Sequence, residues 1–115
     1  MTEKYERQMK KGILDLLVLK LLNRQPKYGY QLISELRDQS DGIFVLKEGT
    51  LYPILYRLED DGLIESRWSE LEGKQVPRKY YAMTEKGKTA LGEIRQVWEQ
   101  IAFGVAKFLD GGEAE

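Results

Sequence analysis

The sequence of 115 residues contains no cysteine and no histidine. Without cysteine there are no disulfides, no thiolate metal sites and no cysteine nucleophile. Without histidine the chain lacks the commonest general base and the commonest metal ligand. We therefore predict that the protein is not an enzyme and carries no metal ion and no cofactor, although carboxylate or lysine chemistry stays open to it in principle.

The sequence also lacks a long apolar run. Residues 1–7 are largely charged and have none of the apolar character of a signal peptide. The most apolar stretch, residues 13–22, is interrupted by Asp15 and Lys20 and is too short to span a bilayer. We expect a cytoplasmic protein with no membrane partner.

Excess charge of one sign is missing too, because the net charge is only −1. Many nucleic-acid-binding proteins are basic overall, so this balance argues mildly against such a partner. Local charge matters more for contact with phosphates, and it is uneven here. Residues 4–11 carry four basic side chains against Glu6, and residues 73–81 carry Lys74, Arg78 and Lys79 with no acid.

Apolar residues recur at three- and four-residue steps in four segments, which predicts helices over residues 4–23, 28–39, 48–61 and 84–109. From Ile13 onward the first segment is apolar around most of its circumference, so we expect it to be buried on several sides. Gly62 is expected to end the third helix. Pro53 is tolerated in a first turn, so the regular part of that helix should start near Thr50.

After Gly62 the apolar period changes to two, over residues 64–69 and again over 78–83, which predicts two strands of a hairpin. The connector 70–77 is long and expected to be mobile. Helices followed by a hairpin form a winged helix-turn-helix. We therefore predict a mainly α fold with a small β-hairpin: a winged-helix domain at 1–83, a C-terminal dimerisation helix at 84–110, and a frayed tail at 111–115.

In a winged helix the third helix enters the major groove of DNA. Steps of 100° put one set of residues opposite its buried stripe: Gly49, Pro53, Tyr56 and Arg57, with Thr50 and Tyr52 beside them. Small residues let the backbone approach the groove, and hydroxyl and guanidinium groups supply donors. The alternative is an ordinary solvated helix face.

The predicted hairpin carries Lys74, Arg78 and Lys79 towards its tip. A basic tip of this kind can straddle a phosphate backbone. The alternative is an ordinary surface loop.

The last predicted helix has a narrow apolar seam spaced three, four, three, four, three: Leu91, Ile94, Trp98, Ile101, Val105 and Phe108. Such spacing is typical of a helix that pairs with a partner helix, so we predict a homodimer. Tyr5, Met9, Ile13 and Leu16 are the expected partners of this seam. The alternative is packing against the chain's own domain.

Several segments together resemble the PadR family of transcriptional regulators: residues 28–32, 48–59, 61–64, 78–81 and 84–87. The single helix after the wing is similar to the short subfamily, which includes multidrug-responsive repressors. The resemblance implies a winged-helix homodimer that represses nearby genes and is released by a small molecule. Together with the patterns above, it leads us to expect contact with double-stranded DNA from Tyr28, Tyr30, Gln31, Lys47, Gly49, Thr50, Tyr52, Pro53, Tyr56, Arg57, Lys74, Arg78 and Lys79.

Trp98 lies in the middle of the seam. Some short PadR-like repressors hold a planar aromatic effector between subunits beside such a tryptophan. The resemblance therefore implies an effector site formed by Met9, Leu16 and Trp98, where the indole offers a flat surface for stacking and for cations. The simpler alternative is that Trp98 only packs in the interface.

These observations predict a DNA-binding repressor that recognises an inverted-repeat operator as a homodimer and responds to a small effector. The alternative is a winged-helix module that binds other proteins through the same surfaces, which the slightly acidic charge favours.

Overall fold

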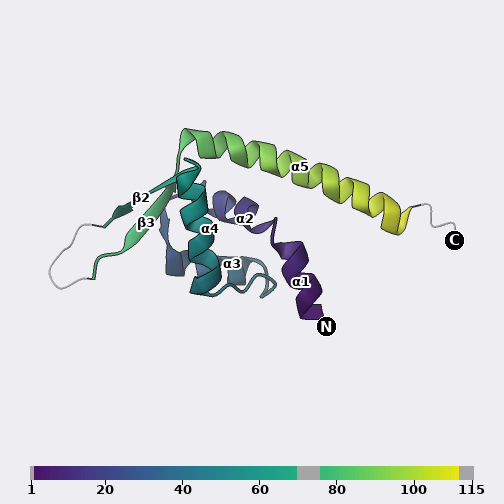
Figure 1. The fold of residues 1–115 in the computed structure, drawn as a ribbon, viewed down its shortest axis with the longest axis horizontal. Helices are drawn as coiled ribbons and strands as arrows, with labels where there is room; N and C mark the ends of the chain where they lie inside the picture. The colour runs from purple at the N-terminus through teal and green to yellow at the C-terminus, as the bar shows by residue number, and fades with distance from the viewer. Residues whose placement is uncertain (1, 70–75, 112–115) are drawn as a thin grey trace.

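The computed structural model describes residues 2–69 and 76–111, and it is a winged helix with a long C-terminal helix (Figure 1). This confirms the predicted fold class. The elements in chain order are α1 (Thr2–Lys10), α2 (Leu14–Leu22), β1 (Lys27–Tyr28), α3 (Gly29–Gln39), α4 (Glu48–Asp60), β2 (Ile64–Trp68), β3 (Lys79–Met83) and α5 (Glu85–Asp110).

The molecule is elongated, with extents of 67 × 33 × 21 Å. Figure 1 shows the β2–β3 wing projecting to one side of α4, and α1 and most of α5 lying towards the other. The second half of α5 runs beyond the rest of the chain, so its side chains there have few neighbours in the same chain.

One hydrophobic core holds the winged domain together, and α2 lies at its centre. As its all-round apolar pattern predicts, α2 packs against α3, α4, α5 and β3. The buried stripes predicted for α3 and α4 are confirmed, and the core consists of Leu14, Val18, Leu19, Leu21, Leu22, Leu32, Leu36, Leu46, Leu51, Ile54, Leu55, Leu58, Ile64, Tyr81 and Leu91.

The single helix predicted over residues 4–23 is wrong, because residues 11–13 form a turn between α1 and α2. The amide of Ile13 donates to the carbonyl of Lys10 at 2.9 Å and closes that turn. Gly12 lies within it, and glycine weakens a helix by about 1 kcal/mol relative to alanine. The break lets α1 lie at an angle to α2 (Figure 1).

The predicted start of α4 at Glu48 is confirmed, but the expectation that its regular part begins near Thr50 is wrong, since Pro53 occupies the sixth position and not the first turn. Proline there removes one helical hydrogen bond, the one to the carbonyl of Gly49. Gly49 and Pro53 are both exposed, so water can satisfy that carbonyl. Packing of the Leu51 to Leu58 stripe outweighs this local loss.

The wing is a three-stranded antiparallel sheet of order β1-β3-β2, where a two-stranded hairpin was predicted. The extra strand has two residues and pairs Lys27 with Tyr81 and Tyr28 with Tyr80. Two residues after Pro26 are too few to show an alternating pattern. The strand anchors the beginning of α3 to the wing.

Some predictions fall outside the described residues. Lys74 and most of the connector 70–77 lie there, as does the tail apart from Gly111. Within the described ranges, no helix has the length and apolar character needed to cross a bilayer. Nor does any group of three or more acidic, cysteine or histidine side chains in these ranges form a site that could hold a metal ion.

The turn at Gly62 and Leu63 joins α4, the wing and α5. Gly62 has φ 77°, as the predicted glycine terminator requires, and the amide of Leu63 donates to the carbonyl of Leu58 at 3.0 Å. The amide of Thr84 donates to the Leu63 carbonyl at 3.1 Å, and the Thr84 hydroxyl donates to the Gly62 carbonyl at 2.7 Å. The Thr84 side chain also caps α5 by accepting from the amide of Gly87.

We predict that Gly87→Ala destabilises the fold. A Cβ at this position would overlap the Leu63 carbonyl oxygen and lie 3.1 Å from Met83 Sδ, and backbone cannot move aside as a flexible side chain can. Forcing an added methyl into packed structure costs about 1–3 kcal/mol, to be measured as a lower urea midpoint at fixed protomer concentration.

Gly92→Ala is the matched control, because it lies one and a half turns along the same helix with open space around its Cβ position. It should stabilise the fold slightly, by up to about 1 kcal/mol, through higher helix propensity. Equal midpoints for the two variants would show that Gly87 makes no essential close contact.

A second prediction concerns Tyr81, which is 1% exposed and whose hydroxyl has no hydrogen-bond partner among the described residues. Burial raises the pKa of Tyr81 to about 12, from an ordinary value of 10.0. The folded state therefore disfavours the phenolate. Ionisation of Tyr81 leaves the free energy of unfolding unchanged below pH 10. As the pH rises from 10 towards 12, the unfolded chain loses the phenol proton first, and the free energy of unfolding falls progressively.

Tyr81→Phe should keep the packing and remove the unpaired hydroxyl, so the free energy of unfolding at pH 7 should rise by about 1 kcal/mol. The variant should also lose less stability than the wild type between pH 10 and pH 12, where the Tyr81 phenol titrates. Tyr30→Phe, at an exposed tyrosine, should change neither property. A less stable Tyr81→Phe variant would mean that the hydroxyl has a partner.

Candidate nucleic-acid interface

Helices α3 and α4 begin on the same pattern: an extended residue with no side-chain cap. The N-cap residues are Tyr28 and Lys47, with ψ of 165° and 164°, and neither side chain accepts a bond from the first turn. Uncapped helix starts leave backbone N–H groups that can bind phosphate oxygens. By contrast, Thr84 caps α5 with its side chain.

A hollow of about 610 Å³ lies between the exposed face of α4, the start of α3 and the wing. It brings together six of the predicted DNA-contact residues: Tyr28, Tyr30, Tyr52, Tyr56, Arg78 and Lys79. Gly29, Trp68, Pro77 and Tyr81 complete its lining. Among the described residues, no acidic side chain lines this hollow, so its polar groups are hydroxyls and cations.

Close contacts between aromatic rings and cations organise this hollow. The Tyr52 ring crosses the start of α3, where a Cβ on Gly29 would overlap its hydroxyl. Desolvation raises the pKa of Tyr52 above its ordinary value. The Tyr52 and Tyr56 ring centroids lie 6.1 Å apart, and the Lys79 ammonium lies 5.9 Å from the Tyr56 centroid. The wing and α4 are thus linked at their exposed surfaces.

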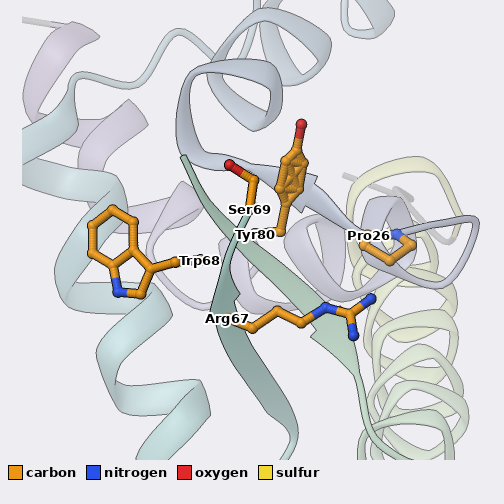
Figure 2. A pocket seen from close by; sticks show the side chains of 5 residues that line it. All are labelled: Pro26, Arg67, Trp68, Ser69 and Tyr80. Carbon is orange, nitrogen blue, oxygen red and sulfur yellow. The ribbon is translucent and has the colours of Figure 1, made fainter. Parts of the chain in front are cut away.

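The alternation of the strands divides the wing residues between two faces. Trp68 pairs across the strands with Lys79, and Arg67 pairs with Tyr80. Figure 2 shows Trp68 projecting from one side of β2, with Arg67 on the other side. Sequence reasoning did not include Trp68 in the site, although its register beside Lys79 in the predicted hairpin was the signal for it.

A second stack links the wing to the start of α3. The Arg78 guanidinium lies 4.6 Å from the centroid of the Tyr28 ring, and the Tyr28 and Tyr80 centroids are 5.5 Å apart. Tyr80 also lines a shallow hollow with Pro26, Arg67, Trp68 and Ser69 (Figure 2). Arg78 is thereby held beside the N-terminus of α3.

Arg57, at the end of the predicted DNA-facing set, is paired with a carboxylate of a neighbouring helix. Its guanidinium forms two hydrogen bonds with Asp15 of α2, at 2.7 and 2.9 Å. The hydrogen bond to Asp15 is the main cause of a raised pKa of Arg57. The pair ties α4 to α2 and leaves the Arg57 side chain 51% exposed, so its contact with DNA stays a prediction.

The remaining predicted DNA residues are spread around the starts of α3 and α4. Gly49 and Pro53 are exposed, and Gln31 is half-buried. Lys47 and Thr50 line a different groove, between α1 and the start of α4. That groove also contains Arg7, Lys10 and Lys11, which belong to the basic cluster that the sequence shows over residues 4–11.

The predicted dimer residues divide into two groups. Leu91 is buried in the chain's own core, so its assignment to a dimer interface is wrong, and Ile94 is partly buried against the same core. The rest of the α5 seam is exposed, namely Trp98, Ile101, Val105 and Phe108. Tyr5 and Met9 are exposed as well, and Ile13 is half-buried.

The three predicted effector residues lie around one cavity. Met9, Leu16 and Trp98 line a hollow of about 430 Å³ between α1, α2 and α5. Most of its other lining is apolar, from Gly12, Ile13, Ile94, Val97 and Ile101. Glu93 is the one charged residue of the described lining. The sequence analysis did not identify it, because a single acidic residue on a helix does not indicate a ligand site.

Comparisons with known proteins agree with this arrangement. The model of the "Transcriptional regulator PadR-like family" matches residues 18–93. An uncharacterized protein of Lysinibacillus sphaericus is 33% identical over 105 residues, covering 90% of this chain and 94% of that protein. The negative transcriptional regulator PadR of Bacillus subtilis is 29% identical over 79 residues, which cover 69% of this chain but only 43% of that protein.

Among solved structures, a PadR family transcriptional regulator from Eggerthella lenta superposes with a TM-score of 0.82 at 37% identity, covering 95% of this chain and 92% of that one. The match thus extends from the winged domain along α5. The chain belongs to the PadR-like family of transcriptional regulators.

Proposed function

We propose that this protein is a cytoplasmic DNA-binding repressor without catalytic activity, which binds an inverted-repeat operator as a homodimer. The observation that carries the proposal is the hollow between α4 and the wing. Its described lining is aromatic and cationic, with no acid to repel a phosphate backbone. Members of the family regulate transcription, so DNA is the expected ligand of this surface.

In this proposal α4 enters the major groove with its first two turns. Gly49, Thr50 and Pro53 are small and exposed there, so the backbone can approach the base edges. Tyr56, 53% exposed, supplies a hydroxyl one turn further along. Arg78 and Lys79 bind phosphates beside the groove, and their contacts with Tyr28 and Tyr56 hold them in place.

The second copy of the chain is the proposed occupant of the exposed face of α5. Trp98, Ile101, Val105 and Phe108 follow one another along this face, and Phe108 is 86% exposed. A continuous apolar face of this length is unfavourable in water and is typical of an interface. Two-fold pairing would present two copies of α4 to half-sites about 34 Å apart.

The cavity between α1, α2 and α5 is the proposed effector site. A volume of about 430 Å³ suits a small ligand. The Trp98 indole offers a face for stacking, and the Glu93 carboxylate at an apolar wall favours a positive charge. We propose a planar aromatic cation as effector and release of DNA as the response. The proposed repressor role is in line with the name of the Bacillus subtilis relative, a negative transcriptional regulator.

We predict that Tyr56→Ala lowers operator affinity at least tenfold. The change removes an exposed donor from α4 and the ring beside Lys79, with little loss of core packing. Affinity is measured by fluorescence anisotropy on a labelled duplex from the gene's upstream region. Wild-type affinity should fall steeply with salt, with a slope of about −0.9 per neutralised phosphate.

Phe103→Ala is the matched control, because it removes another exposed aromatic ring, on α5, which is 66% exposed against 53% for Tyr56. Sedimentation should show a dimer for the wild type and both variants, at twice the chain mass of 13.4 kDa. A wild-type dimer that binds no upstream duplex at low salt would contradict DNA binding and favour the protein-interaction module.

The effector site makes a separate prediction. In a Trp68→Phe background, Trp98 is the one remaining tryptophan of the chain. Its fluorescence should be quenched by a planar aromatic cation such as acriflavine. Adding Glu93→Gln should weaken this binding about tenfold while leaving affinity for a neutral planar compound unchanged, because only the charge at the wall is lost. Unchanged Trp98 fluorescence across a panel of planar cations would contradict the site.

A further inference from the structure

Helix α1 has two chemically different sides. Its Thr2–Met9 residues are all exposed, and Lys10 is half-buried, so the helix lies on the surface of the chain. Met9 faces the cavity beside α5. Arg7, Lys10 and Lys11 instead line a groove of about 750 Å³ against the start of α4.

The groove is basic and adjoins the proposed DNA-reading helix. Its charged lining consists of four cations, Arg7, Lys10, Lys11 and Lys47, and two carboxylates, Glu3 and Glu6. Thr50, in the first turn of α4, lies on its edge. Lys47 is the uncapped N-cap of the same helix.

Lys10 holds α1 in place through contacts with the rest of the chain, whereas the other cations of the groove make no ion pair with any described residue. Its ammonium donates to the carbonyl of Ile43, lies 5.3 Å from the Phe44 ring centroid, and pairs with Glu6 at 3.5 Å. Within the described residues, Arg7, Lys11 and Lys47 form no ion pair. All three side chains are exposed, and the groove keeps an excess of positive charge, with four cations against two carboxylates.

We infer that α1 and the turn after it form a second DNA-contacting element, whose Arg7 and Lys11 bind backbone phosphates at the start of α4 together with Lys47 at the N-cap of that helix. Figure 1 shows α1 and the wing on opposite sides of α4. Phosphate contacts on both sides would fix the helix in the groove from two directions. The inference rests on the proposed DNA binding and extends it to a surface that the hairpin and α4 do not provide.

The test neutralises Arg7 of α1 and Lys11 of the turn that follows it, in the whole chain, with the double variant Arg7→Gln/Lys11→Gln. A dimer would lose four phosphate contacts, so the slope of log affinity against log salt should fall in magnitude by about 3.6. Affinity at 0.1 M salt should drop at least tenfold, and equally for the upstream duplex and for a scrambled duplex of the same length, because phosphate contacts carry no sequence information.

Lys88→Gln/Arg95→Gln is the matched control, since it removes two exposed cations from α5 and changes the net charge equally. The charge-retaining variant Arg7→Lys/Lys11→Arg should bind as the wild type does, which separates the role of charge from any effect on folding or dimerisation. If Arg7→Gln/Lys11→Gln matches the Lys88→Gln/Arg95→Gln control while the wild type binds DNA, the inference fails and the proposed function survives. If the wild type binds neither duplex, both fail.

Discussion

The turn at Gly62 and Leu63 is the constraint on which the geometry of the whole chain depends. Gly62 ends α4 in a left-handed conformation, and the wing begins at the next buried residue, Ile64. The Leu63 carbonyl accepts from the Thr84 amide, and Gly87 lets α5 pass directly over that carbonyl. One turn therefore sets the directions of the reading helix, the wing and the long helix together.

Periodicity alone was sufficient to predict most of this fold, because each helix of the winged domain buries a regular stripe in one core. Three features escaped it for physical reasons. The turn at 11–13 contains Gly12 and interrupts an apolar period that continues across it, and α4 keeps Pro53 in its interior because core packing overrides local propensity. Strand β1 consists of Lys27 and Tyr28, and exists only because β3 supplies its partners.

The candidate site was predictable to a similar degree. The exposed face of α4 and the position of Lys79 in β3 follow from helical and strand geometry, and the structure brings Tyr56 and Lys79 within 5.9 Å, ring centroid to ammonium. The role of Arg57 was not predictable, because its partner Asp15 is 42 residues away along the chain. The same holds for Leu91, whose heptad position suits either a partner helix or its own core.

Helix α1 shows how the two halves of the proposed function can share one element. Its cations lie in the groove at α4, whereas Met9 and the following Gly12 and Ile13 line the cavity beside Trp98. The turn at 11–13 connects it to α2, the central helix of the core. A ligand that favours one placement of α1 would therefore change the affinity for DNA, and DNA would change the affinity for that ligand by the same factor. Such coupling requires no movement of the core, because the element that both ligands touch lies entirely on its surface.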